Sequence, residues 1–203
     1  NSSNPVMSII DTNNITIKGQ GFNCTFLRQS GTGHGFSFLR SVSTGIRNLT
    51  LQDFTLVYDG SSTTPKGIDG LDVIELTMER VNVANFKNHQ THLRGNDQGH
   101  SVIRDSRFTC GEGALAGSAG VKIEGGQNQM TQNNYFNIGG VSPTWTRCET
   151  GLDMRGADSH VSIGDMVDGA KYGIRAGPAA ITVINPFLDN TSAGKLLCGI
   201  QMV

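Results

Sequence analysis

The sequence has 203 residues, a net charge of -1, and only 16% charged residues. A nearly neutral chain of this kind argues against a nucleic-acid-binding protein and against a protein that binds membranes through a basic surface. No apolar run approaches the roughly 18 residues that a membrane-spanning helix requires, so we expect no membrane insertion. The length suits one domain. Because the sequence starts without methionine and stops directly after an apolar run, we expect residues 1–203 to be one domain of a longer chain.

Short bursts of alternating apolar and polar residues begin near the start of the chain. Ile15 and Ile17 form the first, and the segments 48–56 (NLTLQDFTL) and 75–83 (ELTMERVNV) superimpose without a gap. A period of two residues is typical of β-strands. No segment longer than about ten residues keeps the 3.6-residue period of a capped helix, so we expect little helix.

The bursts recur along the rest of the chain at a step of roughly 20 to 32 residues, which is typical of a solenoid. Close copies are 102–108 (VIRDSRF) and 130–136 (MTQNNYF), and looser copies are 161–167 (VSIGDMV) and 181–187 (ITVINPF). Short strands between Gly and Asn turns indicate coils of parallel strands rather than helix pairs. We therefore predict an all-β fold, a right-handed single-stranded parallel β-helix, whose hand follows from its parallel crossovers.

A second phase of the repeat precedes the later copies. Its members are HLRG (92–95), KIEG (122–125), DMRG (153–156) and GIRAG (173–177). The apolar residues predicted to point inward are Leu93, Ile123, Met154 and Ile174. The residues predicted to point outward are Arg94, Glu124, Arg155 and Arg175.

Equivalent side chains of a β-helix stack, because neighbouring coils lie about 4.8 Å apart. One outward ladder of alternating charge is predicted to contain Arg94, Glu124 and Arg155. A second, at the turn after a strand, is predicted to contain Asp53, Arg80 and Asp105. Such stacked opposite charges contribute at most about 1 kcal/mol each. We therefore interpret the similar segments that start at Leu93 and Met154 mainly as scaffold.

The segment ITIKGQGFNCTFLRQ (15–29) contains an I-x-G-x-G turn that leads into a further strand. It resembles the opening coil of the pectate-lyase-like β-helix superfamily. Followed by coils of the LTLQDFTL and VIRDSRF type, the chain is most similar to the β-helix domains of bacteriophage tailspikes and tail fibres. The resemblance covers nearly the whole chain, but it is a pattern of fold and carries over no catalytic motif.

The resemblance implies an extracellular homotrimer on the virion, in contact with other phage tail proteins. It further implies binding of bacterial surface polysaccharide, which many such spikes also cleave as hydrolases or lyases. Others only bind or serve as structural parts. The alternatives are a non-enzymatic structural or adhesion β-helix and a free secreted polysaccharide lyase. The structural alternative predicts that every outward carboxylate is paired with an arginine of a ladder or bonded to a turn.

Glycoside hydrolysis usually needs two carboxyl groups that flank the sugar bond. Asp97 and Asp158 hold equivalent places two coils apart, which corresponds to about 9.6 Å on straight coils. Glu124 lies on the coil between them, and Asp153 lies beside its column. These four are the candidate catalytic residues. The alternative is that the Asp side chains cap turns by binding backbone N–H groups.

Carbohydrate binding is predicted for four other side chains. Trp145, the only Trp, lies in an insertion (139–149) and offers an indole face to a sugar ring, unless it packs on the coils or on another subunit. Arg94, Arg155 and Tyr172 complete the predicted binding set.

No metal ion or other cofactor is predicted. His89 and His92 form the one close histidine pair, but in a strand they would face opposite sides. His100 and His160 follow the candidate carboxylates within a few residues.

The four cysteines show neither CxxC pairing nor metal-ligand spacing. They are Cys24, Cys110, Cys148 and Cys198. Small buried side chains are favoured, since free Cys is mostly buried. Disulfide pairing, within the fold or with another chain, stays open.

Overall fold

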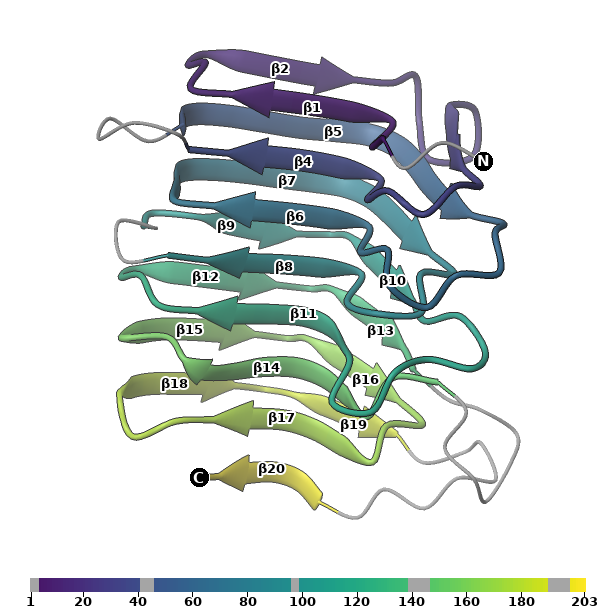
Figure 1. The fold of residues 1–203 in the computed structure, drawn as a ribbon. Helices are drawn as coiled ribbons and strands as arrows, with labels where there is room; N and C mark the ends of the chain where they lie inside the picture. The colour runs from purple at the N-terminus through teal and green to yellow at the C-terminus, as the bar shows by residue number, and fades with distance from the viewer. Residues whose placement is uncertain (1–3, 41–45, 96–98, 139–146, 190–197) are drawn as a thin grey trace.

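The chain winds into a stack of β-coils that runs from the N-terminal to the C-terminal end (Figure 1). The computed structural model describes residues 4–40, 46–95, 99–138, 147–189 and 198–203. Within these residues no helix occurs, so none is present that could cross a membrane. The strands are β1 (Met7–Ile10), β2 (Ile15–Lys18), β3 (Phe26–Gln29), β4 (Phe36–Leu39), β5 (Ile46–Tyr58), β6 (Ile68–Leu71), β7 (Val73–Ala84), β8 (Thr91–Arg94), β9 (Val102–Arg104), β10 (Arg107–Thr109), β11 (Ala119–Glu124), β12 (Gln129–Gln132), β13 (Tyr135–Asn137), β14 (Thr150–Gly156), β15 (Ser159–Ile163), β16 (Met166–Asp168), β17 (Tyr172–Ala176), β18 (Ala180–Ile184), β19 (Phe187–Asp189) and β20 (Cys198–Met202).

Two parallel sheets form the walls of the stack. Sheet A has the order β1-β4-β6-β8-β11-β14-β17-β20. Sheet B has two halves, β18-β15-β12-β9 and β10-β13-β16-β19, which the long strand β7 joins, and the long strand β5 pairs with β7 and with β2 and β3. In Figure 1 the strands of sheet A run to the left in front and those of sheet B to the right behind, while the chain descends. The solenoid is therefore right-handed, and the predicted fold class is confirmed.

The repeated segments predicted from the sequence are the strands that pair with one another in sheet B. Strand β5 pairs with β7 so that Leu49 lies on Leu76 and Leu56 on Val83. The two close copies also pair as predicted, with Phe108 on Phe136. The predicted alignment of the segments 161–167 and 181–187 was wrong by one residue, because Val161 pairs with Thr182 and not with Ile181.

The inward side chains of sheet A form a continuous apolar core. Leu93, Ile123, Met154 and Ile174 are all fully buried, as predicted. The register of the last of these was wrong by two residues, because Ile174 pairs with Leu152 and not with Met154. This shift places Arg175 next to Asp153 on the outer face, whereas the sequence alignment set Arg175 beside Arg155.

The corner between the two halves of sheet B needs a left-handed backbone residue in nearly every coil. The residues at this corner, with φ between 48° and 62°, are Asp53, Arg80, Asp105, Asn133, Gly164 and Asn185. Asn, Asp and Gly adopt this conformation with the least strain, which explains part of their abundance. The predicted ladder is confirmed at its first step, where Arg80 Nε lies 2.6 Å from Asp53 Oδ1.

A polar cluster interrupts the core behind β12 and β15. Asp165 is fully buried and accepts hydrogen bonds from Thr131 Oγ1 (2.5 Å), Ser162 Oγ (2.7 Å) and the Asn134 backbone N–H (2.9 Å). His160 Nε2 lies 3.1 Å from the same Thr131 hydroxyl. In this part of sheet B the apolar residues of the alternation point outward and the polar ones inward, since a strand presents alternate residues to opposite faces. His160 is therefore a core residue and does not lie beside the candidate carboxylates.

Burial disfavours the charged form of both titratable groups in this cluster. It lowers the pKa of His160 to about 3. It also raises the pKa of Asp165, and the hydrogen bonds that this carboxyl accepts offset only part of the effect. Both groups are therefore stabilised in their neutral forms.

The buried His160 predicts that the folded state loses stability at acidic pH. The unfolded chain protonates His160 near pH 6.5 and the folded chain only near pH 3, so its contribution is lost as pH falls through that window. We expect His160→Gln to lose less unfolding free energy than the wild type between about pH 7.5 and about pH 5. Urea unfolding at both pH values measures the difference. Equal losses in the two proteins would contradict the assignment.

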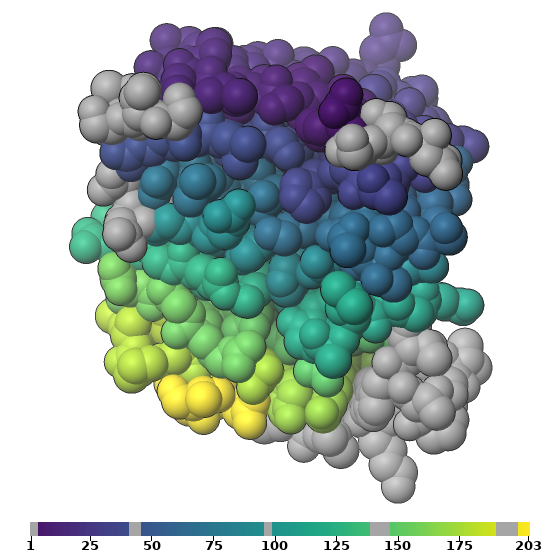
Figure 2. Space-filling model, viewed as in Figure 1, coloured from purple at the N-terminus to yellow at the C-terminus, as the bar shows by residue number. Residues whose placement is uncertain are grey.

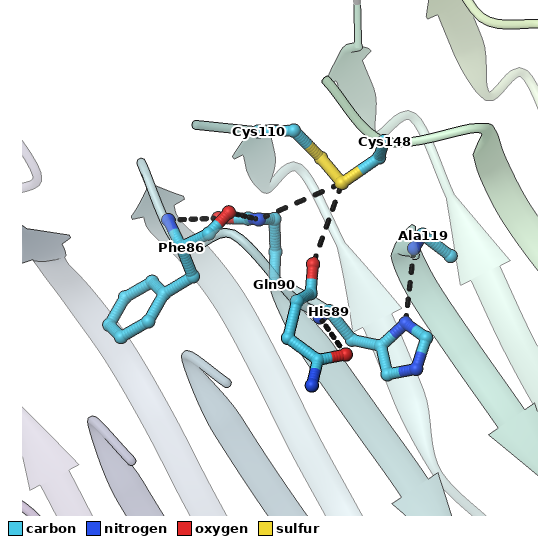
Figure 3. Close-up of a disulfide and its surroundings, with 7 residues drawn as sticks. Phe86, His89, Gln90, Cys110, Ala119 and Cys148 are labelled. Atoms are coloured by element: carbon cyan, nitrogen blue, oxygen red, sulfur yellow. Dashed lines mark hydrogen bonds between the residues drawn. A yellow bond between two sulfur atoms is a disulfide. The ribbon is translucent and has the colours of Figure 1, made fainter. Parts of the chain in front are cut away.

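A disulfide joins the end of β10 to the turn before β14. Cys110 and Cys148 are 38 residues apart in sequence and are bonded at an S–S distance of 2.10 Å (Figure 3). Beside it, the buried Gln90 side chain holds the turn by accepting from the Phe86 backbone N–H (3.2 Å) and donating to the Phe86 carbonyl (2.7 Å). The preference for reduced cysteines was thus wrong for this pair, because only the fold brings the two together. Cys24 is free and exposed.

Removal of the disulfide should destabilise the solenoid. Closing a loop of 38 residues restricts the unfolded chain, so we expect Cys110→Ala to lower the unfolding free energy by about 2–4 kcal/mol. Denaturant unfolding under non-reducing conditions measures it, with Cys24→Ala as the matched control. If both variants keep wild-type stability, the bond does not form in solution.

Candidate functional site

Charged side chains gather along one column on the outer face of sheet A. Strand pairing sets them side by side from coil to coil. We call these five residues the charged column: Asp69, His92, Lys122, Asp153 and Arg175. Figure 2 shows this face as successive bands of colour, each band one coil of the stack. A molecule that lies along the helix axis therefore crosses one titratable or charged side chain of this column on each of five successive coils.

Asp69 is the buried anchor of the column. It is only 3% exposed, and it accepts hydrogen bonds from Lys66 Nζ (2.7 Å) and Arg94 Nη2 (3.0 Å). His34 Nε2 lies 3.7 Å from its second oxygen. Burial alone would raise the pKa of Asp69, but the hydrogen bonds from Arg94 and Lys66 outweigh burial and lower the pKa to about 2. Asp69 is therefore ionised and holds two cations at the surface.

Glu124, two residues after Lys122 on β11, has a similar role. It forms a close ion pair with Lys122, and His92 Nε2 lies 2.8 Å from its Oε2. Burial opposes ionisation, but the hydrogen bonds from Lys122 and His92 lower the pKa of Glu124 to about 2. The predicted pairing of Glu124 with Arg94 across the strands is confirmed as a register contact, although each side chain forms its ion pair elsewhere.

His89 and His92 lie on the same side of the molecule, which corrects the prediction that they face opposite sides. Their rings are 4.8 Å apart. His89 precedes β8 and lies in the turn, where the alternation of a strand does not apply, and its Nδ1 accepts the Ala119 N–H at 3.0 Å (Figure 3). Burial is the main cause that lowers the pKa of both, to about 3 for His89. Both imidazoles are therefore neutral at pH 7.

Asp153 and Arg155 form the next charged pair. The Asp153 carboxylate is 1% exposed and accepts from Arg155 Nε (2.8 Å) and Nη2 (2.7 Å). A register shift between β11 and β14 sets Glu124 opposite Gly156, so Arg155 leaves the predicted ladder by one residue. Lys122, Glu124, Asp153 and Arg155 together line a shallow depression in the outer face.

Arg175 extends the column towards the C-terminal end. Its guanidinium lies 4.4 Å from the ring centroid of Tyr172, and its Nε donates to Gln201 Oε1 at 2.9 Å. Lys171 Nζ lies 5.2 Å from the same ring. Two cations contact the ring of Tyr172, which therefore orients Arg175, and the predicted role of Tyr172 in sugar binding stays a prediction.

The structure brings part of the predicted site together. Glu124 and Asp153 line one depression, whereas Asp158 is exposed in the turn between β14 and β15 and does not line it. Asp97 and Trp145 lie outside the described residues. The catalytic assignments of the four carboxylates are not tested by this geometry and stay predictions.

Sequence reasoning missed Asp69, Lys66 and Lys122. The four-residue segments that revealed the second phase already contained His92, Lys122 and Asp153 in their first positions. Reading that first position as outward, two residues before the arginine or glutamate, would have found the column. Among the described residues, no group of three or more His, Cys, Asp or Glu side chains is placed to hold a metal ion.

Comparison with known proteins assigns no family. No protein-family model matches the sequence, and no curated protein matches it. Among solved structures, the fold is similar to an alginate lyase from Paenibacillus sp. str. FPU-7, with a TM-score of 0.36 and 15% identity over 98% of this chain and 92% of the lyase. The chain is a parallel β-solenoid. Its strand pairing establishes this fold directly.

Asp69, a buried carboxylate that pairs with two cations, should contribute strongly to the stability of the fold. Removing one charge from a buried pair leaves the partners unbalanced, so we expect Asp69→Asn to lower the unfolding free energy by about 3 kcal/mol. The matched control is Asp158→Asn, an exposed carboxylate, for which we expect a change within about 0.5 kcal/mol. Equal effects in denaturant unfolding would show that the Asp69 network is not formed.

Proposed function

We propose that the outer face of sheet A binds an acidic polysaccharide that lies along the helix axis. The observation that carries the proposal is one cation on each of five successive coils. These cations are Lys66, Arg94, Lys122, Arg155 and Arg175. Three carboxylates, Asp69, Glu124 and Asp153, pair with four of these cations, so these eight side chains together carry more positive than negative charge.

The carboxylates of the column offset part of the positive charge and also position the cations. Asp69 orients Arg94, and Asp153 orients Arg155 through two hydrogen bonds. A side chain that is already ordered loses less conformational freedom when a ligand binds. A guanidinium keeps N–H donors available beyond those that its own carboxylate uses, and it suits the carboxylate of an acidic sugar.

We further propose that the protein is an extracellular tailspike-like component of a phage virion, a homotrimer that contacts other tail proteins and binds bacterial surface polysaccharide. The resemblance of 15–29 and of the later coils supports this role. The Cys110–Cys148 disulfide supports an extracellular location, because disulfides persist at virion and cell surfaces and are rare in the cytosol.

The proposal assigns binding, not hydrolysis, to this face. Hydrolysis needs one carboxyl group that stays protonated near neutral pH. The pKa values of Asp69 and Glu124 lie near 2, and among the described carboxyl groups with a shifted pKa only that of Asp165, inside the core, is raised. The catalytic roles predicted for Asp97 and Asp158 are tested by incubating the wild type with polyuronate and measuring new reducing ends.

Cation removal should weaken binding to acidic polymers selectively. A charge-assisted hydrogen bond is worth about 1.5–3 kcal/mol, so we expect Arg175→Ala and Lys122→Ala each to weaken the binding of polyuronate by about tenfold or more. The matched control is Arg104→Ala, an exposed arginine on sheet B that pairs with Glu79. Calorimetric titration at low and high salt measures the affinity, which should fall as salt rises.

Two outcomes contradict the proposal. One is wild-type binding that survives both substitutions and is lost in the Arg104 variant. The other is retention of neutral polymers only. Release of new reducing ends by the wild type would make the chain a depolymerase, and single substitutions of Asp97, Glu124, Asp153 and Asp158 would then locate the chemistry.

A further inference from the structure

A second depression lies on the outer face of sheet B, at the left-handed corner between β9 and β10. The side chains that line it are Phe22, Asp105, Ser106, Arg107, Asn133 and Tyr135. None of them belongs to the charged column. The depression combines two aromatic rings with a carboxylate, an amide and a guanidinium.

Backbone hydrogen bonds fix the position of Phe22 at the surface. It lies in the loop between β2 and β3, where its carbonyl accepts the Thr55 hydroxyl at 2.5 Å. The preceding Gly21 donates its N–H to the Asp53 carbonyl at 2.8 Å. The Phe22 side chain remains 38% exposed. These bonds to the next coil give the ring a defined place at the edge of the depression.

The opposite side of the depression is also ordered. Arg107 lies over the Tyr135 ring, 4.9 Å from its centroid, and the Tyr135 hydroxyl donates to Asp168 Oδ2 at 3.2 Å. The side chains of Asp105 and Asn133 are linked by a hydrogen bond of 3.3 Å from the amide. Asp105, Arg107 and Asn133 are all exposed. Exposed donors and acceptors therefore line the same depression as the Phe22 ring.

We propose that this depression binds a neutral sugar unit. A pyranose has an apolar C–H face that suits an aromatic ring and hydroxyl groups that both donate and accept hydrogen bonds. Asp105 accepts from hydroxyls, Arg107 donates to them, and the Asn133 amide does both. The charges of Asp105 and Arg107 balance, and the carboxylate disfavours an acidic sugar. The specificity thus differs from that of the charged column.

The site is independent of the proposed function, because it lies on the other sheet. It acts as a second contact for a glycan, or as a contact for a different glycan. Its failure would leave the acidic-polysaccharide proposal intact.

A glycan array of neutral hexose oligosaccharides and of oligouronates, probed with the intact chain, tests the inference. We expect the wild type to bind at least one neutral member, and Phe22→Ala to weaken that binding by about tenfold while leaving oligouronate binding unchanged. The matched control is Phe26→Ala, which removes an even more exposed ring (59%) from the neighbouring strand without touching the depression. Asn133→Gly, which removes the amide and tolerates the left-handed backbone at this position (φ 53°), should reduce binding in the same direction as Phe22→Ala.

Three results overturn the inference. They are no binding to any neutral member, neutral binding that Phe22→Ala leaves unchanged, and an equal loss in the Phe22 and Phe26 variants. Thermal unfolding of each variant separates lost binding from lost fold. Binding to oligouronates only, abolished by Arg175→Ala, would refute the neutral site and retain the acidic one.

Discussion

The in-register parallel pairing of one coil with the next is the constraint on which the rest of the structure depends. Because Leu49 lies on Leu76 and Phe54 on Val81, every inward residue meets another inward residue, and every outward residue stacks into a column. A strand alternates its side chains between two faces, so a slip of one residue would exchange core and surface. The left-handed corner residues keep the coils equal in phase, since each coil turns at the same place.

The same pairing makes the outer face of sheet A chemically distinct. Stacking at coil spacing brings Asp69, His92 and Lys122 together from three coils, although more than 20 residues separate each from the next in sequence. Long side chains then cover the carboxylates, which become buried on a face that would otherwise be open to water. Burial alone would raise the pKa of Asp69, but the hydrogen bonds from Arg94 and Lys66 outweigh burial and lower the pKa to about 2. A fixed row of cations follows from geometry that no single coil contains.

In the interior, burial favours the neutral form of titratable groups, in contrast to the ionised carboxylates of the outer face. Asp165 and His160 lie inside the stack, where burial favours the neutral form of each, while hydrogen bonds satisfy the carboxyl. Outer carboxylates surrounded by cations stay ionised, whereas this inner one, surrounded by hydroxyl and amide groups, does not gain enough to offset desolvation. The location of a carboxyl group relative to the sheet therefore decides its chemistry more than its residue type does.

The sequence by itself determined the class of fold, the inward residues and the main repeats, because two-residue alternation and turn residues act over a few positions. It also predicted the ladder at Asp53 and Arg80. Only the tertiary structure decided the ion partners of Arg94 and Arg155, the common face of His89 and His92, and the pairing of Cys110 with Cys148. These depend on register shifts and turn lengths between coils, which move a side chain by one or two positions and leave the local alternation unchanged.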